Sequence, residues 1–292
     1  MKRKGIILAG GTGSRLYPST ISVSKQLIPV YDKPMIYYPL SVFMTADIRE
    51  ILIITTPEDQ SAFQKLLGDG SQLGLHISWA IQPKPEGLAQ ALIIAEDYLD
   101  GAPSALILGD NLFFGSIFDE AFTASQCMER GATIFGYQVN DPKQYGVAEL
   151  NENNQVLSIE EKPTHPKSNY AVTGLYLYDG YAPQYAKTIT PSERGELEIT
   201  ALHQIYLERG ELTCQVIDSG SSWLDTGTHR KLLQAAQLVH VIEDRQGIRI
   251  CCPEAIAYQK GWITNDELLT LAQPLNKSGY GNYLIKVAGG QK

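Results

Sequence analysis

The chain is poor in cysteine, and this shortage excludes two classes of protein. Four cysteines occur among 292 residues, and no two of them have CxxC spacing. Neither a disulfide framework nor a cysteine-rich metal site is therefore expected. We interpret the thiols as structural, with a metal or redox role as the alternative. They are Cys127, Cys214, Cys251 and Cys252.

Basic charge and long apolar runs are scarce as well. The 24 Lys and Arg residues stand against 32 Asp and Glu residues, and the net charge of −8 offers no general attraction to nucleic acid or to an anionic membrane. Apolar runs such as 51–54 are far shorter than the ~20 residues of a membrane helix. The basic N-terminus precedes glycines rather than a small-residue cleavage site, so we expect a cytoplasmic protein without nucleic-acid or membrane partners.

What the chain does have is a 43% hydrophobic composition without an internal repeat, which is typical of a globular protein. Short apolar runs alternate with helical patterns through the first half, and this predicts an α/β fold with a mainly parallel sheet covered on both faces. Pro39 conflicts with the first helix, so we expect a kink or a late start there. The predicted strands are 4–9, 51–55, 77–82, 105–108 and 132–139, and the predicted helices are 34–46, 58–67, 86–99 and 116–130.

The pattern changes after residue 140. Segments 146–150 and 155–159, separated by a polar turn, predict an antiparallel hairpin, and a further strand is expected at 170–178. We interpret this stretch as a second lobe laid against the sheet.

Helical periodicity returns at 198–209 and 228–243. We therefore divide the chain into a core at 1–227, with the lobe at about 140–227, and a helical C-terminal region at 228–292. That region is expected to pack on the core or to form a subunit contact.

The loop after the first predicted strand contains Gly10, Gly11 and Gly13, followed by Arg15. Ligands of a parallel sheet bind beyond the carboxyl ends of its strands. Glycines let backbone N–H groups approach an anion, and Arg15 adds a fixed positive charge, so we predict a phosphate cradle, with a plain tight turn as the alternative. The loop lacks both the Lys-Ser/Thr of a P-loop and the last glycine of the dinucleotide fingerprint, which leaves nicotinamide binding as a runner-up.

Two aspartates are candidate metal ligands. Asp110 follows the apolar run at 105–108, and a carboxylate at the carboxyl end of a strand suits Mg²⁺, although it could instead cap a following helix. Asp225, after Trp223 and Leu224, is a second candidate, and spacing does not show whether it meets Asp110. Lys25 and Lys162 lie next to loops or strand ends, where composition alone favours solvated surface charges.

Taken together, these segments resemble the sugar-1-phosphate nucleotidylyltransferase family over nearly the whole length of the chain. Several motifs in the same order carry the resemblance, and no single one would suffice. The motifs are Gly10 to Leu16, Ser24-Lys25-Gln26-Leu27-Ile28-Pro29-Val30, Gln82-Pro83, Gly87-Leu88-Ala89, Gly109-Asp110-Asn111, Tyr145-Gly146-Val147, Glu161-Lys162-Pro163, Arg194 to Thr200, and Trp223-Leu224-Asp225-Thr226-Gly227.

The resemblance implies a Rossmann-like core and a defined reaction. Its implied substrates are dTTP and α-D-glucose 1-phosphate, its implied products are dTDP-glucose and pyrophosphate, and its implied cofactor is Mg²⁺. A homotetramer is also implied. Because uracil presents the same edge as thymine, a uridylyltransferase stays open as an alternative. A nicotinamide-dependent sugar reductase and a non-catalytic nucleotide-sugar sensor are more remote alternatives.

The resemblance also implies roles for individual residues. Asp110 and Asp225 would bind Mg²⁺, Arg15 and Lys25 would hold the triphosphate and the leaving pyrophosphate, and Lys162 with Arg194 would hold the sugar phosphate. The attacking phosphate oxygen is already anionic, so no general base is expected among the five histidines. The implied nucleotide-binding residues are Leu8, Gly10, Gly11, Thr12, Gly13, Gln82 and Gly87, and the implied sugar-phosphate-binding residues are Asn111, Tyr145, Gly146, Glu161, Lys162, Val172 and Arg194.

Overall fold

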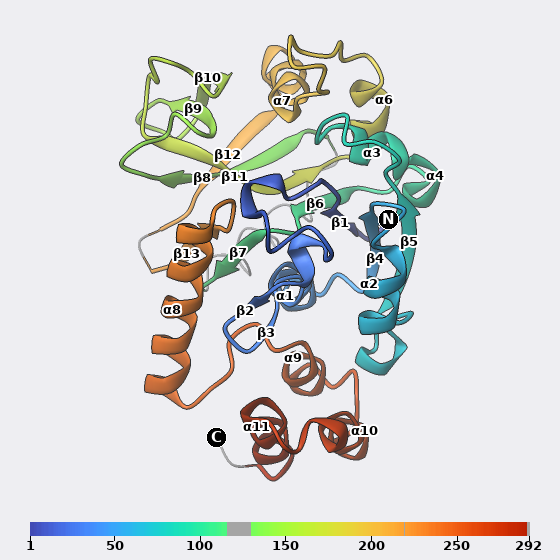
Figure 1. Ribbon diagram of the computed structural model, residues 1–292. Coiled ribbons are helices and arrows are strands. Elements are labelled where there is room, and N and C mark those ends of the chain that lie inside the picture. The colour runs from blue at the N-terminus through green and yellow to red at the C-terminus, as the bar shows by residue number, and fades with distance from the viewer. Residues whose placement is uncertain (116–129, 219, 291–292) are drawn as a thin grey trace.

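The structure, a computed structural model, describes residues 1–115, 130–218 and 220–290. Its centre is a nine-stranded sheet with the order β10-β9-β11-β6-β1-β4-β5, and β8 joins β11 and carries β12 (Figure 1). The strands of this sheet are β1 (Lys4–Ala9), β4 (Glu50–Thr55), β5 (His76–Ile81), β6 (Ser104–Leu108), β8 (Ala132–Gln138), β9 (Gly146–Leu150), β10 (Val156–Glu161), β11 (Tyr170–Tyr178) and β12 (Leu212–Val216).

Two small sheets and a set of helices complete the described chain. β2 (Pro29–Val30) pairs with β3 (Lys33–Pro34), and β7 (Asn111–Phe114) pairs with β13 (Ser222–Asp225). The α-helices are α1 (Tyr37–Thr45), α2 (Gln60–Leu67), α3 (Gln90–Ile94), α4 (Glu96–Leu99), α6 (Ala182–Ala186), α7 (Ile199–Glu208), α8 (His229–Gln246), α9 (Pro253–Gln259), α10 (Asn265–Ala272) and α11 (Gly279–Ala288).

The four strands β6, β1, β4 and β5 are parallel neighbours. Leu8 in β1 lies beside Ile54 of β4 and Leu108 of β6, so the carboxyl ends of the three strands reach the same edge of the sheet. These strands are nearly continuous apolar runs because side chains on both faces are covered. The predicted α/β fold with a mainly parallel central sheet is confirmed.

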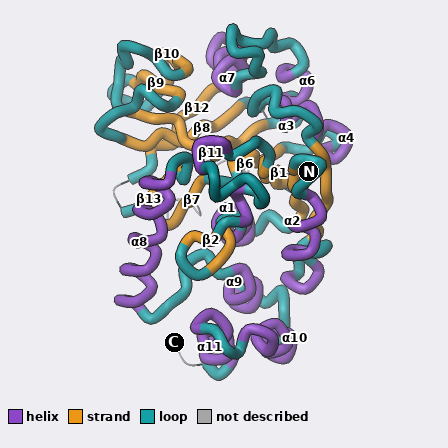
Figure 2. Tube along the Cα trace, viewed as in Figure 1, coloured by secondary structure: helices purple, strands orange, loops and turns teal. Residues whose placement is uncertain are grey.

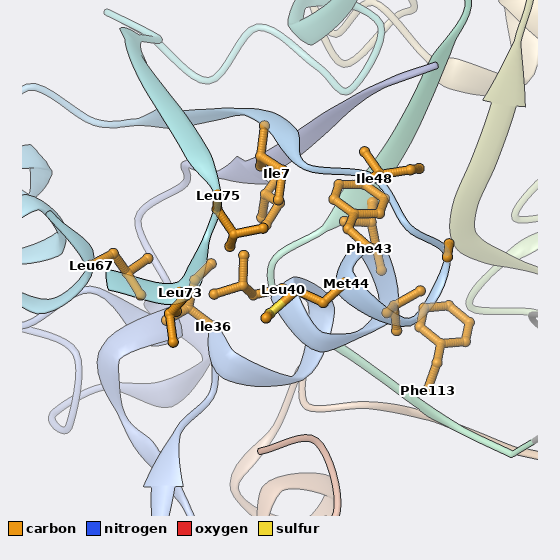
Figure 3. Close-up of a cluster of buried hydrophobic side chains, with 14 of the residues drawn as sticks. Ile7, Ile36, Leu40, Phe43, Met44, Ile48, Leu67, Leu73, Leu75 and Phe113 are labelled. Atoms are coloured by element: carbon orange, nitrogen blue, oxygen red, sulfur yellow. The ribbon is translucent and has the colours of Figure 1, made fainter. Parts of the chain in front are cut away.

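Successive side chains of the central strands point to opposite faces, and each face has its own core. Ile7, Ile53 and Ile107 belong to a cluster with residues of α1, α2 and α9 to α11, part of which Figure 3 shows around Phe43 and Met44 of α1. The alternate residues, such as Ile6, Leu52 and Leu106, belong to a second cluster with α3, α4, α6 and α7. Helices therefore lie on both sides of the strands (Figure 2).

The predicted hairpin is present as β9 and β10, but its relation to the sheet differs from the prediction. β11 pairs antiparallel with β6, β8 and β9, so the strands of the lobe are hydrogen-bonded into the central sheet. The lobe extends the sheet instead of lying against it. Along one edge β11 pairs with β9 at Ala171 and with β6 from Leu175 onward. Its pairing with β8 shifts register between Val172 and Tyr176.

Two predicted helices begin later than expected. α1 begins at Tyr37, and Pro39 lies in its first turn, where its missing N–H would have no helical partner. The helix predicted from residue 86 begins only at Gln90, because the Glu86 carbonyl accepts from the Leu197 N–H and the Ala89 N–H donates to the Leu197 carbonyl. The helix predicted at 116–130 and Cys127 lie outside the described residues.

The C-terminal region consists of α8 and a group of three shorter helices. α8 packs Ala235 and Val239 against Val30 and Tyr38, and α9 to α11 lie beyond α1 in Figure 1. Within the described parts of the chain, no helix combines the length and the apolar character needed to cross a membrane.

Candidate active site

The glycine-rich loop leaves β1 at the sheet edge where β6 also ends. A side chain at position 10 would collide with Gln82, because a Cβ on Gly10 would lie 2.4 Å from Oε1 of Gln82. Gly13 has a φ of 59° and is followed by the short 3₁₀ turn Ser14–Leu16, which carries Arg15. The loop borders a cavity of about 410 Å³, here named the loop cavity, together with Lys25, Gln82 and Asp110.

Gln82, buried at the end of β5, is held in one orientation. Its Nε2 donates to Oε1 of Gln90 at 2.7 Å and to the Gly87 carbonyl at 3.4 Å. Gly87 has a φ of 113°, and a Cβ there would lie 2.4 Å from the Leu197 backbone nitrogen. The Gln82 amide and Gly87 thus both line the loop cavity, and an amide side chain can recognise the polar edge of a ligand.

Asp110 follows β6 through a turn that leads into strand β7, so the helix-cap interpretation is wrong. Its Oδ2 lies 2.5 Å from Nζ of Lys25, and its Oδ1 accepts from the Asn111 amide at 2.8 Å. Burial alone would raise the pKa of Asp110, but Lys25 and these hydrogen bonds lower it below its ordinary value. The carboxylate is therefore ionised at neutral pH. Lys25, whose side chain is 11% exposed, is not a solvated surface charge.

Asp225 lies beside this group because β13 pairs with β7, with Asp225 opposite Asn111. The Thr226 N–H also donates to the Asp110 carbonyl, at 3.3 Å. Oδ2 of Asp225 accepts from the Tyr145 hydroxyl at 2.5 Å and from Nζ of Lys231 at 2.8 Å. Pairing between β7 and β13 thus settles what spacing left open, and brings both carboxylates to the border of one cavity.

That second cavity, of about 580 Å³, is here named the lobe cavity because β9, β10 and β11 form one of its walls. Glu161 stands at the end of β10, where its Oε1 lies 3.2 Å from Nζ of Lys162 and 3.5 Å from Nη2 of Arg194. Lys162 and Arg194 are about half exposed, so their charges can meet an anion that enters from solvent.

All the site residues expected from the sequence border one or both cavities. The two cavities share Arg15, Leu88, Asp110 and Gly227, so ligands in them would be neighbours. Leu8, Gly10, Gly11, Thr12, Gly13, Lys25, Gln82 and Gly87 line the loop cavity, and Asn111, Tyr145, Gly146, Glu161, Lys162, Val172, Arg194 and Asp225 line the lobe cavity.

Three further polar residues at the site were missed by the sequence reasoning. Gln90 orients Gln82, Gln26 is buried beside the loop with its Nε2 3.4 Å from the Gly10 carbonyl, and Lys231 pairs with Asp225. Gln26 stood inside a recognised motif and could have been found there. No sequence motif pointed to Gln90 or Lys231, because each contacts a site residue that lies in a different element or loop.

The two aspartates form a donor set suited to a hard divalent cation. Mg²⁺ usually keeps several waters and binds through one or two carboxylates together with substrate phosphates. Asp110 and Asp225 supply two carboxylates at the border of the lobe cavity, and Asp110 also borders the loop cavity. Among the described residues no group of three or more His, Cys, Asp or Glu could hold a metal ion, so water and substrate phosphates are expected to supply the remaining ligands.

Comparison with known proteins gives consistent matches. The family described as Nucleotidyl transferase matches residues 4–241. The glucose-1-phosphate thymidylyltransferase of Xanthomonas campestris pv. campestris is 56% identical over 287 residues, which cover 98% of this chain and 97% of that protein. The enzyme of the same name from Neisseria gonorrhoeae is 54% identical over 286 residues, covering 98% of this chain and 99% of that protein.

A solved structure is also similar. It is a Bacillus anthracis protein assigned as a glucose-1-phosphate thymidylyltransferase, in complex with sucrose. The match has a TM-score of 0.76 and 43% sequence identity, and covers 81% of this chain and 95% of that chain.

Proposed function

This chain belongs to the nucleotidyl transferase family, and from this premise we propose that it transfers a thymidylyl group from dTTP to α-D-glucose 1-phosphate, giving dTDP-glucose and pyrophosphate. The observation that carries the proposal is the 56% identity to a glucose-1-phosphate thymidylyltransferase over 98% of the chain. Two adjoining cavities that share Arg15 and Asp110 support it, because the reaction must bring two phosphorylated molecules into contact.

In the proposed reaction, a phosphate oxygen of glucose 1-phosphate attacks the α-phosphorus of dTTP in line. A new oxygen–phosphorus bond forms while the bond to the leaving pyrophosphate breaks. The attacking oxygen is already an anion at neutral pH, so the protein need not remove a proton from it. The task of the protein is to hold two anions in line. Such alignment can lower the activation free energy by ~7–11 kcal/mol.

Cationic side chains would overcome the repulsion between the two substrates. Arg15, which borders both cavities, would lie against the triphosphate, and Lys25 would hold the leaving pyrophosphate. Lys162 and Arg194 would hold the phosphate of the sugar, and Glu161 would accept from sugar hydroxyls. Fixed donors of this kind stabilise charge that grows in the transition state.

Gln82 would recognise the base. Its Nε2 already donates to Gln90 and to the Gly87 carbonyl, so its Oε1 would accept from the N3–H on the edge of thymine. Gln90 keeps that amide in place, and the backbone at Gly87 lies next to it. Since uracil has the same edge, we expect the enzyme to accept UTP as a weaker substrate.

The residues present fit a divalent cation. Asp110 and Asp225 would hold Mg²⁺ with oxygens of the substrate phosphates, and the bound ion would neutralise negative charge on the pyrophosphate and the bridging oxygen.

We also propose that the protein works in the cytoplasm as a homotetramer. A nucleoside triphosphate and a sugar phosphate are substrates of intracellular metabolism. Two apolar side chains of α8, Leu233 and Val241, are 59% and 53% exposed, and a subunit contact would cover them. Light scattering on the purified protein would give the molecular mass of the assembly.

A pyrophosphate-release assay tests the proposed activity. Purified protein with Mg²⁺ should release pyrophosphate from dTTP only when glucose 1-phosphate is present. A panel of dTTP, UTP, CTP, ATP and GTP against several sugar 1-phosphates would define its specificity. Binding without release would favour a nucleotide-sugar sensor, and no release from any pair would contradict the proposal. NADPH should not bind, since the chain lacks the dinucleotide fingerprint.

A further inference from the structure

Lys231, in the first turn of α8, makes an unusual set of contacts for a residue outside the motifs of the sequence. Its ammonium lies 2.8 Å from Oδ2 of Asp225 and 2.8 Å from the Tyr145 hydroxyl. It also lies 5.0 Å from the centre of the Tyr145 ring. Lys231 is therefore bound to a carboxylate that the proposed reaction assigns to a metal ion.

The hydrogen bonds of Asp225 leave little room for a second cation. Oδ1 accepts from the Gly227 N–H at 3.1 Å, and Oδ2 accepts from both Tyr145 and Lys231. A metal bound to Oδ2 would lie at about 2.0–2.1 Å from that oxygen, on the same side chain as the ammonium. Two cations on one carboxylate oxygen repel each other strongly in a partly buried site. Metal binding at Oδ2 and the Lys231 contact therefore exclude each other.

Lys231 has space to leave Asp225. Its side chain is 29% exposed and borders the lobe cavity on one side. On the other side it borders a smaller cavity of about 170 Å³, lined also by Tyr137, Trp223 and Gln234. The ammonium of a lysine is carried on a flexible stem of four carbons, so it can move between these spaces without repacking of the core.

We propose that Lys231 is a built-in competitor of the divalent cation at Asp225. Without metal, its ammonium compensates the carboxylate and keeps Asp225 in place beside Asn111. When the metal binds, Lys231 turns into the lobe cavity, where it becomes one more cation for the phosphate of the sugar substrate. The second step rests on the proposed function, whereas the competition does not.

Metal binding by the substrate-free protein tests the competition directly. Mn²⁺ would be titrated into metal-stripped protein, with free Mn²⁺ followed by electron paramagnetic resonance and heat by calorimetry. We expect Lys231→Gln to bind Mn²⁺ at least tenfold more tightly than the unmodified protein. Lys231→Arg keeps the charge and should bind Mn²⁺ as the unmodified protein does.

Arg230→Gln is the matched control. Arg230 is the neighbouring exposed residue of α8, has no described contact with Asp225, and carries the same charge. Its replacement should change the Mn²⁺ affinity by less than about threefold, since an exposed charge at this distance is largely screened. If Lys231→Gln binds Mn²⁺ no more tightly than Arg230→Gln, including the case in which neither binds, the competition is refuted.

Steady-state kinetics test the second step. Lys231→Gln should raise the KM for glucose 1-phosphate about tenfold and leave the KM for dTTP within twofold, because Lys231 borders the lobe cavity and not the loop cavity. Equal changes in both KM values would contradict a role in sugar-phosphate binding. If the protein released no pyrophosphate, the proposed function would be refuted. The competition between Lys231 and the metal would still be tested, since the Mn²⁺ comparison needs no turnover.

Discussion

At the scale of single residues, the site is a set of opposite charges held close together before any substrate binds. Each candidate metal ligand has its own lysine: Lys25 for Asp110 and Lys231 for Asp225. Burial alone would lower the pKa of Lys231, but its hydrogen bonds to Asp225 and Tyr145 raise the pKa overall, so it is charged at neutral pH. Before metal and substrates bind, both lysines are thus held by the carboxylates beside them.

Replacement of Lys25 tests its role at the loop cavity. Lys25→Met should lower kcat by roughly 10²–10³-fold, since it removes one fixed donor from the developing charge. Circular dichroism should show a folded protein. Lys65→Met, on the exposed side of α2, is the control and should keep full activity. An unchanged rate for Lys25→Met would remove this residue from the catalytic machinery.

Because His203 in α7 is buried, we expect the free energy of unfolding to fall in acid. Its Nε2 lies 2.7 Å from the Tyr178 hydroxyl, and burial lowers its pKa to about 3. The folded protein therefore keeps His203 neutral while the unfolded chain binds a proton below its ordinary pKa of 6.5. The free energy of unfolding thus falls as pH decreases from 6.5 towards 3, by about 1.4 kcal/mol per pH unit from this group.

Urea unfolding at pH 7 and pH 5 measures this effect. The loss of unfolding free energy between the two pH values should be about 2 kcal/mol smaller for His203→Gln than for the unmodified protein. His165→Gln, an exposed histidine, should behave as the unmodified protein does. The same pH dependence in His203→Gln and the unmodified protein would show that His203 is not the responsible group.

At the scale of elements, a buried ion pair fastens α8 to the hairpin of β2 and β3. Nζ of Lys33 lies 2.9 Å from Oε1 of Glu243, and the two side chains are 1% and 0% exposed. The hairpin follows the Lys25 turn, while α8 begins next to Asp225 and carries Lys231. This pair therefore links the two segments that supply lysines to the site.

Double-mutant analysis tests the pair. Lys33→Met and Glu243→Gln should each lower the free energy of unfolding by about 1.5–3 kcal/mol, because each removes a buried hydrogen bond between charged groups while Arg249 still pairs with Glu243 and Asp32 with Lys33. The double variant should lose clearly less than the sum, since Asp32 and Arg249 still pair at 3.0 Å. The exposed Lys167 and Glu160 pair is the control, and Lys167→Met should leave the urea midpoint of unfolding essentially unchanged. Additive losses at Lys33 and Glu243 would contradict the coupling.

Most elements of the first half could be predicted from the sequence, and the errors have physical reasons. The parallel strands are recognisable because burial on both faces demands unbroken apolar runs. The late start at Gln90 could not be predicted, since the residues before it bond to Leu197 instead of forming a helical turn. β13 was missed because its four residues pair only with β7, and so short a run has no clear period.

At the scale of the whole molecule, the C-terminal helices share a core with the sheet. Ala255 in α9, Leu268 in α10 and Leu284 in α11 are buried in the same cluster as Ile7 of β1. Helices α9 to α11 therefore cover one side of the central layer instead of forming a separate unit.

Truncation tests this dependence. A chain that ends at residue 247 lacks α9 to α11 and exposes the apolar side of α1. We expect it to lose cooperative folding, because each buried Leu that is removed costs about 2–5 kcal/mol and the total stability of a protein is only about 5–15 kcal/mol. Calorimetry should show one unfolding transition for the full chain and none for the truncated one. A truncated chain with an unchanged melting temperature would show that the rest of the protein folds without α9 to α11.

The sequence by itself determined the parallel strands of the central sheet, the glycine-rich loop at its edge and the residue types of the chemistry. These features are local: periodicity, glycine spacing and a carboxylate after a strand can be read within a few residues. The tertiary structure alone decided that Asp225 borders the same cavity as Asp110, that Gln90 orients Gln82 and that Lys231 binds Asp225. Those contacts join separate elements, and their energies depend on strand pairing and burial that no short stretch of sequence encodes.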